Sequence, residues 1–417
     1  MPTPNNYNIT EFNFNKELIR ILSPERYDPL TVLENDTYSF TVKAWDNDNN
    51  KYVLLKKVFN PLSSAYDSKK IYREFALASK VRHKNVTVFL KTAPILTIID
   101  AYTPQDDWTE FNDIYFVYPN MDTTLRILNT HNRSLLTNKK TGAEFVGFLV
   151  YQLLLAVRFL HQQKLKLVHR DIRPDNIYII RSENDLTATV LKLADIGSAR
   201  QHSPSSDEVV NIYPASYPYR SPETILTDSY EPSVDIWSTG CVLAELIIGR
   251  PTFQRRSSFN LIFDIVSTIG LSDTEISELP DYLQIKVRKN PEKFKKNKIN
   301  EMFDDFMLPN WDKQGINGAE FRNLLNQMLV YDPKKRSNAD ELLKLSLWGY
   351  LKKSPEPNIE AKSEYVEGYG EITEENSNWK KKIFNRLQEY REEKAKKDEE
   401  KKKTATVGDK PGTSTKP

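Results

Sequence analysis

One short loop carries the residues best suited to chemistry. Residues 168–176 read VHRDIRPDN, after an apolar helical stretch at 145–160 and before an apolar strand at 177–180. Asp171 and Asn176 lie five positions apart on this loop. An aspartate so placed accepts a proton from a hydroxyl group, while the asparagine holds a metal ion bound to phosphates. The loop therefore predicts chemistry between a phosphate donor and a hydroxyl group.

Three further motifs follow the loop in a fixed order. The segment Asp195-Ile196-Gly197 comes after a second apolar strand, and its aspartate is the expected second magnesium ligand. The segments at 221–223 (SPE) and 235–238 (DIWS) complete the series. The loop itself matches the kinase signature H-R-D-L-x-x-x-N except for Ile172 in place of leucine. With these four motifs in order, the chain resembles a eukaryotic protein kinase.

Composition restricts the class of protein. The chain has 417 residues, 39% of them hydrophobic, and a net charge of +2, so we expect no nucleic-acid or membrane partner. The single cysteine, Cys241, excludes a disulfide framework and lies in an apolar run, so we expect a buried core thiol. No run approaches the roughly 18 apolar residues of a membrane span, and the N-terminus lacks a signal-peptide core. These features predict a cytoplasmic or nuclear protein.

The expected fold class is α+β, with the two lobes of the kinase fold. Alternating apolar residues at 27–58 predict strands, with a hairpin turn at 46–50, and 68–80 predicts a helix. Helices predominate from residue 125 onward, and 379–390 reads as a last amphipathic helix. The predicted divisions are a flexible N-terminus at 1–14, a small lobe at 15–118, a large lobe at 119–350 with an insertion at about 271–311, an extension at 351–391 packing back on the lobes, and a disordered tail at 392–417.

Several segments narrow the resemblance to MAP kinases, in particular the stress-activated branch. They are the entry segment around 14–27, the stretch at 102–115, the insertion and the final helix. The resemblance implies a monomer that acts on protein substrates and meets upstream MAP kinase kinases, phosphatases or scaffolds.

The resemblance also assigns roles to residues. Lys56 would grip the phosphates of ATP and pair with Glu74, the alternative being a weak surface pair. Asp171 would deprotonate the substrate hydroxyl, and Asn176 and Asp195 would hold Mg²⁺, the alternative being a loop scaffold without chemistry. The other positions of the ATP site are Leu33, Thr41, Leu54, Met121 and Tyr178.

Three further residues near the loop also receive expectations from the resemblance. Arg173 replaces the family's lysine near the γ-phosphate and is counted among the catalytic residues. It keeps the positive charge, but its guanidinium presents its donors in a planar fork. His169 is expected to be a structural histidine, and Arg336 the buried partner of Glu223.

The nucleotide-binding region departs from the family pattern. The three positions of the glycine loop carry Glu34, Asp36 and Ser39. Glycine lets backbone N–H groups approach phosphate oxygens, whereas two carboxylates there repel a polyphosphate. Leu54 and Tyr178 are larger than the residues that usually hold adenine between them. Weak binding of Mg-ATP is therefore expected.

The activation segment departs as well. The Thr-x-Tyr switch of MAP kinases falls on Asn211-Ile212-Tyr213, of which only Tyr213 can be phosphorylated. Tyr217 replaces an arginine that receives phosphotyrosine, and Ser216 replaces a threonine. We expect Asp207 and Glu208 to replace the missing phosphate in part. The residues with regulatory roles are Tyr213, Arg170, Arg73 and Arg220, and the basic set of Lys70, Arg73 and Arg170 is expected to lack the phosphothreonine that would pair with it.

Two functions remain open from the sequence. The first is a MAP-kinase-like Ser/Thr kinase with weak activity or unusual control, which transfers the γ-phosphoryl group of Mg-ATP to protein hydroxyls. The second is a pseudokinase that serves as a binding or scaffold module in a MAP kinase cascade.

Overall fold

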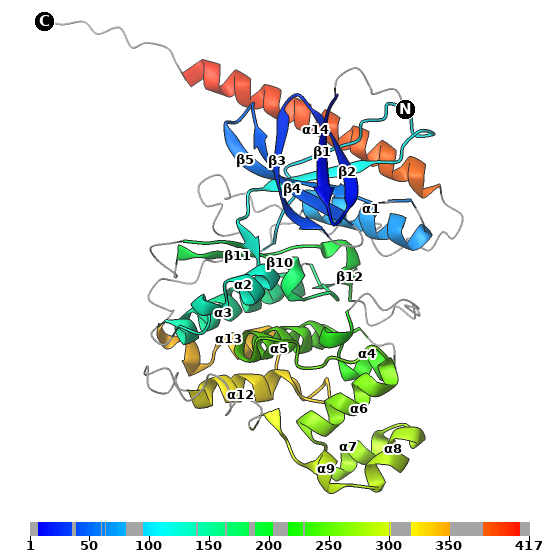
Figure 1. The fold of residues 1–417 in the computed structure, drawn as a ribbon, viewed down its shortest axis with the longest axis vertical. Helices are drawn as coiled ribbons and strands as arrows, with labels where there is room; N and C mark the ends of the chain where they lie inside the picture. The colour runs from blue at the N-terminus through cyan, green and yellow to red at the C-terminus, as the bar shows by residue number, and fades with distance from the viewer. Residues whose placement is uncertain are drawn as a thin grey trace, which may run out of the picture. The chain divides into compact units, whose positions relative to one another are not determined.

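The computed structural model describes residues 7–35, 39–59, 61–62, 64–80, 95–138, 141–162, 165–182, 188–202, 216–227, 230–299, 301, 318–350 and 378–408. The chain forms two compact units (Figure 1). Unit 1 comprises Met1–Tyr72, Ile98–Asn120 and Glu374–Pro417, and unit 2 comprises Arg73–Thr97 and Met121–Thr373. Asp36, Tyr213 and the acidic pair at 207–208 lie outside the described residues.

Unit 1 is built on a five-stranded antiparallel sheet in the order β3-β4-β5-β7-β6. The strands are β3 (Tyr27–Asn35), β4 (Ser39–Asp46), β5 (Lys51–Val58), β6 (Asp100–Tyr102) and β7 (Ile114–Pro119). The predicted turn at 46–50 is confirmed: it joins β4 to β5, and the Asp46 carboxylate accepts the backbone N–H groups of Asp48 and Asn49. Such Asx turns close the chain locally.

The sequence predicted a flexible N-terminus at 1–14, and this does not hold for residues 7–14. Residues 7–14 form strand β1 (Tyr7–Phe14), which pairs antiparallel with β2 (Glu17–Pro24). Phe12 and Phe14 both pack against the buried ring of Phe40. Ile19 and Ile21 of β2 enter the same core as Val42 and Leu55 of the sheet. The asparagines therefore occupy a hairpin whose alternate residues are anchored in the core.

The last helix of unit 1, α14 (Trp379–Gly408), is much longer than predicted. Its first part packs against unit 1 as expected, with Trp379 against Tyr72 and Phe384 against Phe111. Helix then continues through residues that the sequence assigned to a disordered tail. Lys394 pairs with Asp100 at 2.6 Å, and Arg391 donates to the Tyr7 hydroxyl at 3.4 Å. Attachment to the sheet thus extends one turn beyond Tyr390.

Unit 2 is mainly helical, which together with unit 1 confirms the α+β class. Its centre is the buried helix α3 (Gly142–His161), which packs against α5 (Ser233–Ile248), β11 (Val190–Leu193) and α13 (Ala339–Leu343). By length and composition α3 could cross a membrane, which the sequence reading missed, but 78% of its most apolar window is buried in the protein. Cys241 on α5 is buried, as predicted, and burial raises the pKa of its thiol.

The remaining elements complete the two units. Helix α1 (Ala65–Lys80) contributes residues to both, because the division falls after Tyr72. The others all belong to unit 2: β8 (Thr123–Thr124), α2 (Leu125–His131), η1 (Arg133–Leu135), β9 (Leu167–Val168), η2 (Pro174–Asn176), β10 (Ile177–Ile180), β11 (Val190–Leu193), η4 (Ile196–Ser198), β12 (Arg200–Gln201), η5 (Tyr217–Tyr219), α4 (Pro222–Leu226), α6 (Ser258–Ile269), α7 (Asp273–Glu278), α8 (Asp281–Arg288), α9 (Glu292–Lys295), α12 (Gly318–Met328), α13 (Ala339–Leu343) and η6 (Ser346–Tyr350).

Candidate active site

The loop at 168–176 is held in place by Asp235, which lies fully buried in the first turn of α5. Its carboxylate accepts the backbone N–H of His169 at 2.7 Å and that of Arg170 at 2.9 Å. The ring of His161 contacts the same carboxylate at 2.8 Å. Burial would raise the pKa of Asp235, but these hydrogen bonds and the nearby histidines outweigh it and hold the pKa below its ordinary value.

The acid stability of unit 2 should therefore depend on Asp235. Its folded-state pKa lies below the unfolded value of about 3.9, so the ionised carboxylate stabilises the fold above that pH. The stabilisation is lost as the pH falls through the lower, folded-state pKa. In urea titrations from neutral to acidic pH, Asp235→Asn should be less stable than wild type at neutral pH, and the difference should shrink on acidification. Asp264→Asn, which removes a half-buried carboxylate that pairs with the exposed Arg255, is the control. A difference that stays constant with pH would contradict the assignment.

His169 is a structural histidine, as expected. Its Nδ1 accepts the backbone N–H of Asp171 at 3.2 Å, and its Nε2 therefore carries the proton and donates to the Ala194 carbonyl at 2.9 Å. Both ring nitrogens are thus bonded to backbone groups. The ring joins the residue next to Asp195 to the loop that carries Asp171, so the two motifs are held at a fixed separation.

Asp171 and Asn176 are in direct contact. The Asn176 amide nitrogen donates to the Asp171 backbone carbonyl at 2.8 Å and to its carboxylate Oδ2 at 3.1 Å. Because the amide nitrogen faces Asp171, the amide oxygen of Asn176 faces the other way. The Asn176 backbone carbonyl accepts the N–H of Ala194 at 2.8 Å, which places Asn176 beside the strand end that leads into Asp195.

These side chains suit a magnesium ion. Carboxylate and amide oxygens are the ligands that Mg²⁺ takes, in combination with substrate phosphates. Asp195 has left-handed backbone angles (φ 58°, ψ 54°), a conformation that non-glycine residues adopt at a cost and that recurs at functional sites. Ile196 behind it is buried. No group of three or more His, Cys, Asp or Glu side chains that could hold a metal occurs in the described part of the chain.

Arg173 contacts the residue that replaces the family's threonine. Its Nη1 donates to the Ser216 hydroxyl at 2.7 Å, and its Nε lies 3.5 Å from the Asp175 carboxylate. Arg173 therefore joins the loop to the segment before helix α4. The fork of the guanidinium allows it to reach both at once.

In unit 1, the predicted ATP residues share one face of the sheet. Glu34, Thr41 and Lys56 stand directly opposite one another on β3, β4 and β5. Directly opposite residues project to the same side, and so does Leu54, two positions from Lys56. Leu33 lies at the register shift between Val32 and Glu34. The other side of the sheet holds the core with the β1–β2 hairpin.

The structure places the other predicted residues as follows. Glu74 and Arg73 are buried side chains of α1, Met121 is buried just before β8, and Tyr178 is buried in β10 opposite Lys192. Arg220 stacks on the ring of Tyr217 at 4.4 Å.

Arg170, which was predicted to lack a phosphothreonine partner, contacts other groups of the protein. Its guanidinium lies 4.0 Å from the centre of the Tyr230 ring and donates to the Ser198 carbonyl at 3.4 Å. Arg170 also has left-handed backbone angles, with φ 72°. An aromatic ring and a carbonyl oxygen thus contact the guanidinium that a phosphothreonine would otherwise contact.

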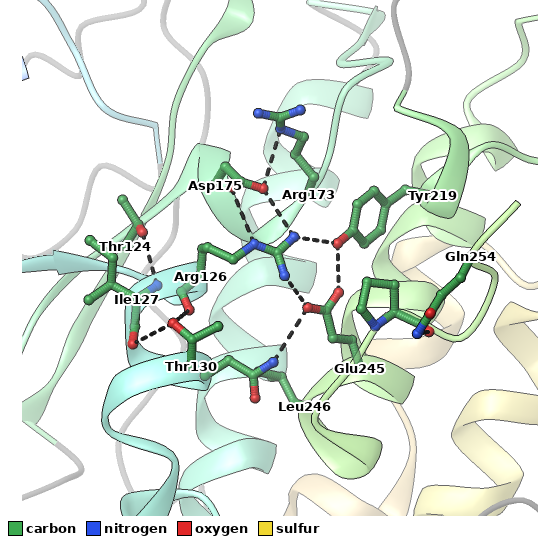
Figure 2. A network of polar contacts seen from close by, with 12 residues as sticks. Thr124, Arg126, Ile127, Thr130, Arg173, Asp175, Tyr219, Glu245, Leu246 and Gln254 are labelled. Atoms are coloured by element: carbon green, nitrogen blue, oxygen red, sulfur yellow. Dashed lines mark hydrogen bonds and ion pairs between the residues drawn. The ribbon is translucent and has the colours of Figure 1, made fainter. Parts of the chain in front are cut away.

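Sequence reasoning missed one group of residues beside the loop (Figure 2). Arg126, in the first turn of α2, contacts Asp175, Tyr219 and Glu245. A cation in the first turn of a helix interacts unfavourably with the helix dipole. The position of Arg126 in the sequence therefore indicated that its side chain has another role.

The chain belongs to the protein kinase family. Residues 32–348 match the protein kinase domain, which agrees with the paired Asp171 and Asn176 and with the β-rich and helical units. The chain is 30% identical over 374 residues to the stress-activated protein kinase jnk-1 of Caenorhabditis elegans, covering 88% of this chain and 73% of that one. It is 29% identical to the stress-activated protein kinase JNK of Drosophila melanogaster (88% and 91%) and to mitogen-activated protein kinase 12 of Danio rerio (87% and 90%). It is therefore a kinase related to the JNK and MAP kinases.

Proposed function

We propose that the protein is a MAP-kinase-like Ser/Thr kinase that transfers the γ-phosphoryl group of Mg-ATP to hydroxyl groups of proteins. The observation that carries this proposal is the bond from the Asn176 amide to Asp171. It orients a carboxylate and an amide oxygen on one loop, as a base and a metal ligand must be oriented. A loop kept only as a scaffold would not need an ionisable group at Asp171.

Each residue has a distinct task in the proposed reaction. Asp171 orients the substrate hydroxyl and accepts its proton. Asn176 and Asp195 would hold magnesium, which when bound offsets the negative charge of the phosphates. Lys56 binds phosphate oxygens with its ammonium group. The bonds of His169 to Asp171 and to the Ala194 carbonyl hold the loop that carries Asp171 and Asn176 at a fixed separation from Asp195.

Arg173 is assigned a positioning task with a positive charge near the transferred group. Its contacts to Ser216 and Asp175 tie the loop to the segment that would receive the protein substrate. We further propose that the protein acts in the cytoplasm or the nucleus, as a monomer, on protein substrates and under upstream kinases, phosphatases or scaffolds.

The second candidate is a pseudokinase, and Glu34 favours it. Glu34 lies in β3 directly opposite Thr41, on the same face as Lys56, at a position where kinases of this family carry glycine. A carboxylate there repels phosphates if both occupy the same side of the sheet.

Stabilisation by nucleotide is the test. A ligand at about 100 times its dissociation constant raises the free energy of unfolding by about 2.7 kcal/mol. We expect Mg-ATP to stabilise wild type only at high concentration, because Glu34 repels it. Glu34→Gln should tighten Mg-ATP binding, and more at low salt than at high salt because the effect is electrostatic.

Glu25→Gln is the matched control, since Glu25 is exposed in the turn between β2 and β3. If Mg-ATP stabilises neither wild type nor Glu34→Gln at any concentration, the kinase proposal is wrong. Equal gains in Glu34→Gln and Glu25→Gln would show that Glu34 does not control affinity.

A further inference from the structure

Helix α8 carries apolar and basic side chains on the face that it turns to solvent. Its buried face consists of Leu283 and Val287, which join a small core with residues of α6 and α9. Tyr282, Ile285 and Lys286 are exposed, and their spacing places them on one side of the helix. Ile285 is 60% exposed, more than any other large hydrophobic side chain in the described part of the chain. The outer face of α8 is therefore neither purely polar nor part of the core.

Two aromatic rings of α6 extend this surface, and α6, α8 and α9 lie together at one end of unit 2 (Figure 1). The Phe259 ring is 39% exposed and lies 5.8 Å from the ring of Tyr282, centre to centre. The Lys286 ammonium lies 4.2 Å from the centre of the Phe259 ring. Lys286 and Lys293 also approach the Phe263 ring, at 5.2 and 5.6 Å, in cation–π contacts. The exposed members of this surface form the basic strip: Phe259, Tyr282, Ile285, Lys286, Arg288, Lys289 and Lys293.

Positive charge is concentrated around the basic strip. Between Tyr282 and Lys298 the sequence holds seven Lys or Arg residues and one acidic residue, Glu292, which gives this stretch a charge of +6. Since the whole chain carries +2, the rest of the chain carries −4. The near-neutral total, which predicts no membrane partner, thus conceals a strong local asymmetry. Such a concentration of charge attracts anionic surfaces over about 8 Å at physiological ionic strength.

Few carboxylates neutralise these cations. Lys295 pairs with Asp273 at 2.8 Å, and Lys296 pairs with Glu301. Among the residues that the structure describes, no carboxylate forms an ion pair with the four cations of the strip, which are Lys286, Arg288, Lys289 and Lys293. These four cations are therefore available to an external anion.

The composition of the strip distinguishes between classes of partner. Six of the seven cations between Tyr282 and Lys298 are lysines, and the one arginine, Arg288, donates to the Gln284 side chain at 2.8 Å. Protein–protein interfaces favour arginine and are poor in lysine. Lysine is a compact, hydrated charge that suits attraction to many lipid headgroups at once, and exposed apolar groups beside it suit the boundary between headgroups and acyl chains. An anionic membrane surface is therefore the partner that fits the strip.

We propose that the basic strip binds anionic lipid headgroups at a membrane surface. Ile285 and Tyr282 enter the outer part of the bilayer, while the four cations contact the phosphate and carboxylate groups of the lipids. The binding is peripheral, because it uses the surface of a folded unit. This inference goes beyond the proposed function, since it requires neither nucleotide nor the loop at 168–176.

Co-sedimentation of the full-length protein with vesicles tests the proposal. Vesicles of phosphatidylcholine and phosphatidylserine in equal parts should bind wild type, whereas vesicles of phosphatidylcholine alone should not. Binding should weaken as salt is raised, because the attraction is largely electrostatic. Hydrogen exchange in the presence of the anionic vesicles should show added protection in peptides covering 281–298 and none in peptides covering 339–345.

Two variants separate the charges from the apolar groups. Lys286→Gln/Lys289→Gln should weaken binding to the anionic vesicles by about tenfold or more, because each cation near such a surface contributes about fivefold. Ile285→Ser should weaken binding several-fold without changing the charge. All three positions are exposed, so the fold should be kept. The matched control is Lys334→Gln/Lys344→Gln, which removes the same charge from exposed positions elsewhere in unit 2 and should bind like wild type.

Several results would overturn the proposal. Wild type that does not sediment with the anionic vesicles would do so, as would an equal loss of binding in the control, since net charge and not the strip would then be responsible. Unchanged binding of Ile285→Ser would remove the apolar part of the proposal. Poly-glutamate that binds as tightly as the vesicles, with the same loss in Ile285→Ser, would assign the strip to an acidic protein instead. Failure of the proposed function would appear as missing nucleotide binding or phosphoryl transfer and would leave vesicle binding unchanged.

Discussion

Replacing Asp171 by asparagine is expected to lower kcat by about 10²–10⁴-fold, the usual contribution of a general base. The amide cannot accept the proton of the substrate hydroxyl. The loop should keep its shape, because the Asn176 amide bonds the backbone carbonyl of Asp171 at 2.8 Å and can still reach a side-chain oxygen. Binding of Mg-ATP, followed by thermal stabilisation, should therefore change little. The measurement is phosphate transfer from labelled ATP to a protein substrate.

Asp122→Asn is a suitable control. Asp122 precedes β8 and accepts the backbone N–H of Arg181, so this change removes a charge from unit 2 without touching the loop at 168–176. Activity that survives in Asp171→Asn at the wild-type level would show that another group accepts the proton. A wild type that binds Mg-ATP but transfers no phosphate would establish the pseudokinase alternative.

Loss of one member of the Arg336–Glu223 pair is expected to destabilise the protein by about 3–5 kcal/mol, because an unpaired charge would remain buried. The Arg336 side chain is fully buried and contacts the Glu223 carboxylate at 2.7 and 3.1 Å. It also donates to the Ser233 and Val330 carbonyls. Arg336→Met should therefore lower the urea midpoint of unfolding strongly.

Lys335→Met provides the neighbouring control. Lys335 lies 62% exposed in a pair with Asp332, and exposed pairs contribute about 0–1 kcal/mol. The double variant Arg336→Met/Glu223→Leu should lose less than the sum of the two single changes, because it leaves no charge unpaired. A small loss in Arg336→Met, equal to that of Lys335→Met, would show that the pair does not support the fold.

Short motifs made part of this structure predictable. The loop at 168–176 and the Glu223–Arg336 pair are encoded by fixed residue types at fixed spacing, and both occur where the sequence placed them. The apolar alternation of β3 to β5 predicted the sheet. In these cases local pattern and tertiary packing agree, which is the condition under which sequence reasoning succeeds.

Other features depend on partners distant in the sequence. Arg126 meets Glu245 and Tyr219 only in three dimensions, at separations of 119 and 93 residues, and no local pattern encodes those contacts. The asparagines of β1 suggest a loop by composition, but Phe12 and Phe14 are fixed by Phe40 on the sheet. The continuation of α14 beyond Tyr390 likewise depends on Asp100, which accepts Lys394.

The contacts between Arg391 and Tyr7 carry a consequence for synthesis of the chain. The two residues are 384 positions apart, yet both belong to unit 1, whereas the residues of unit 2 lie between them in sequence. On the ribosome, which adds about 5–20 residues per second, unit 2 is therefore complete before α14 emerges. Strand β1 therefore stays without its contact to Arg391 until residues 379–408 have been synthesised. Unit 1 should thus depend on chaperones more than unit 2 does. A premature stop near residue 390 should leave strand β1 without its contact to Arg391.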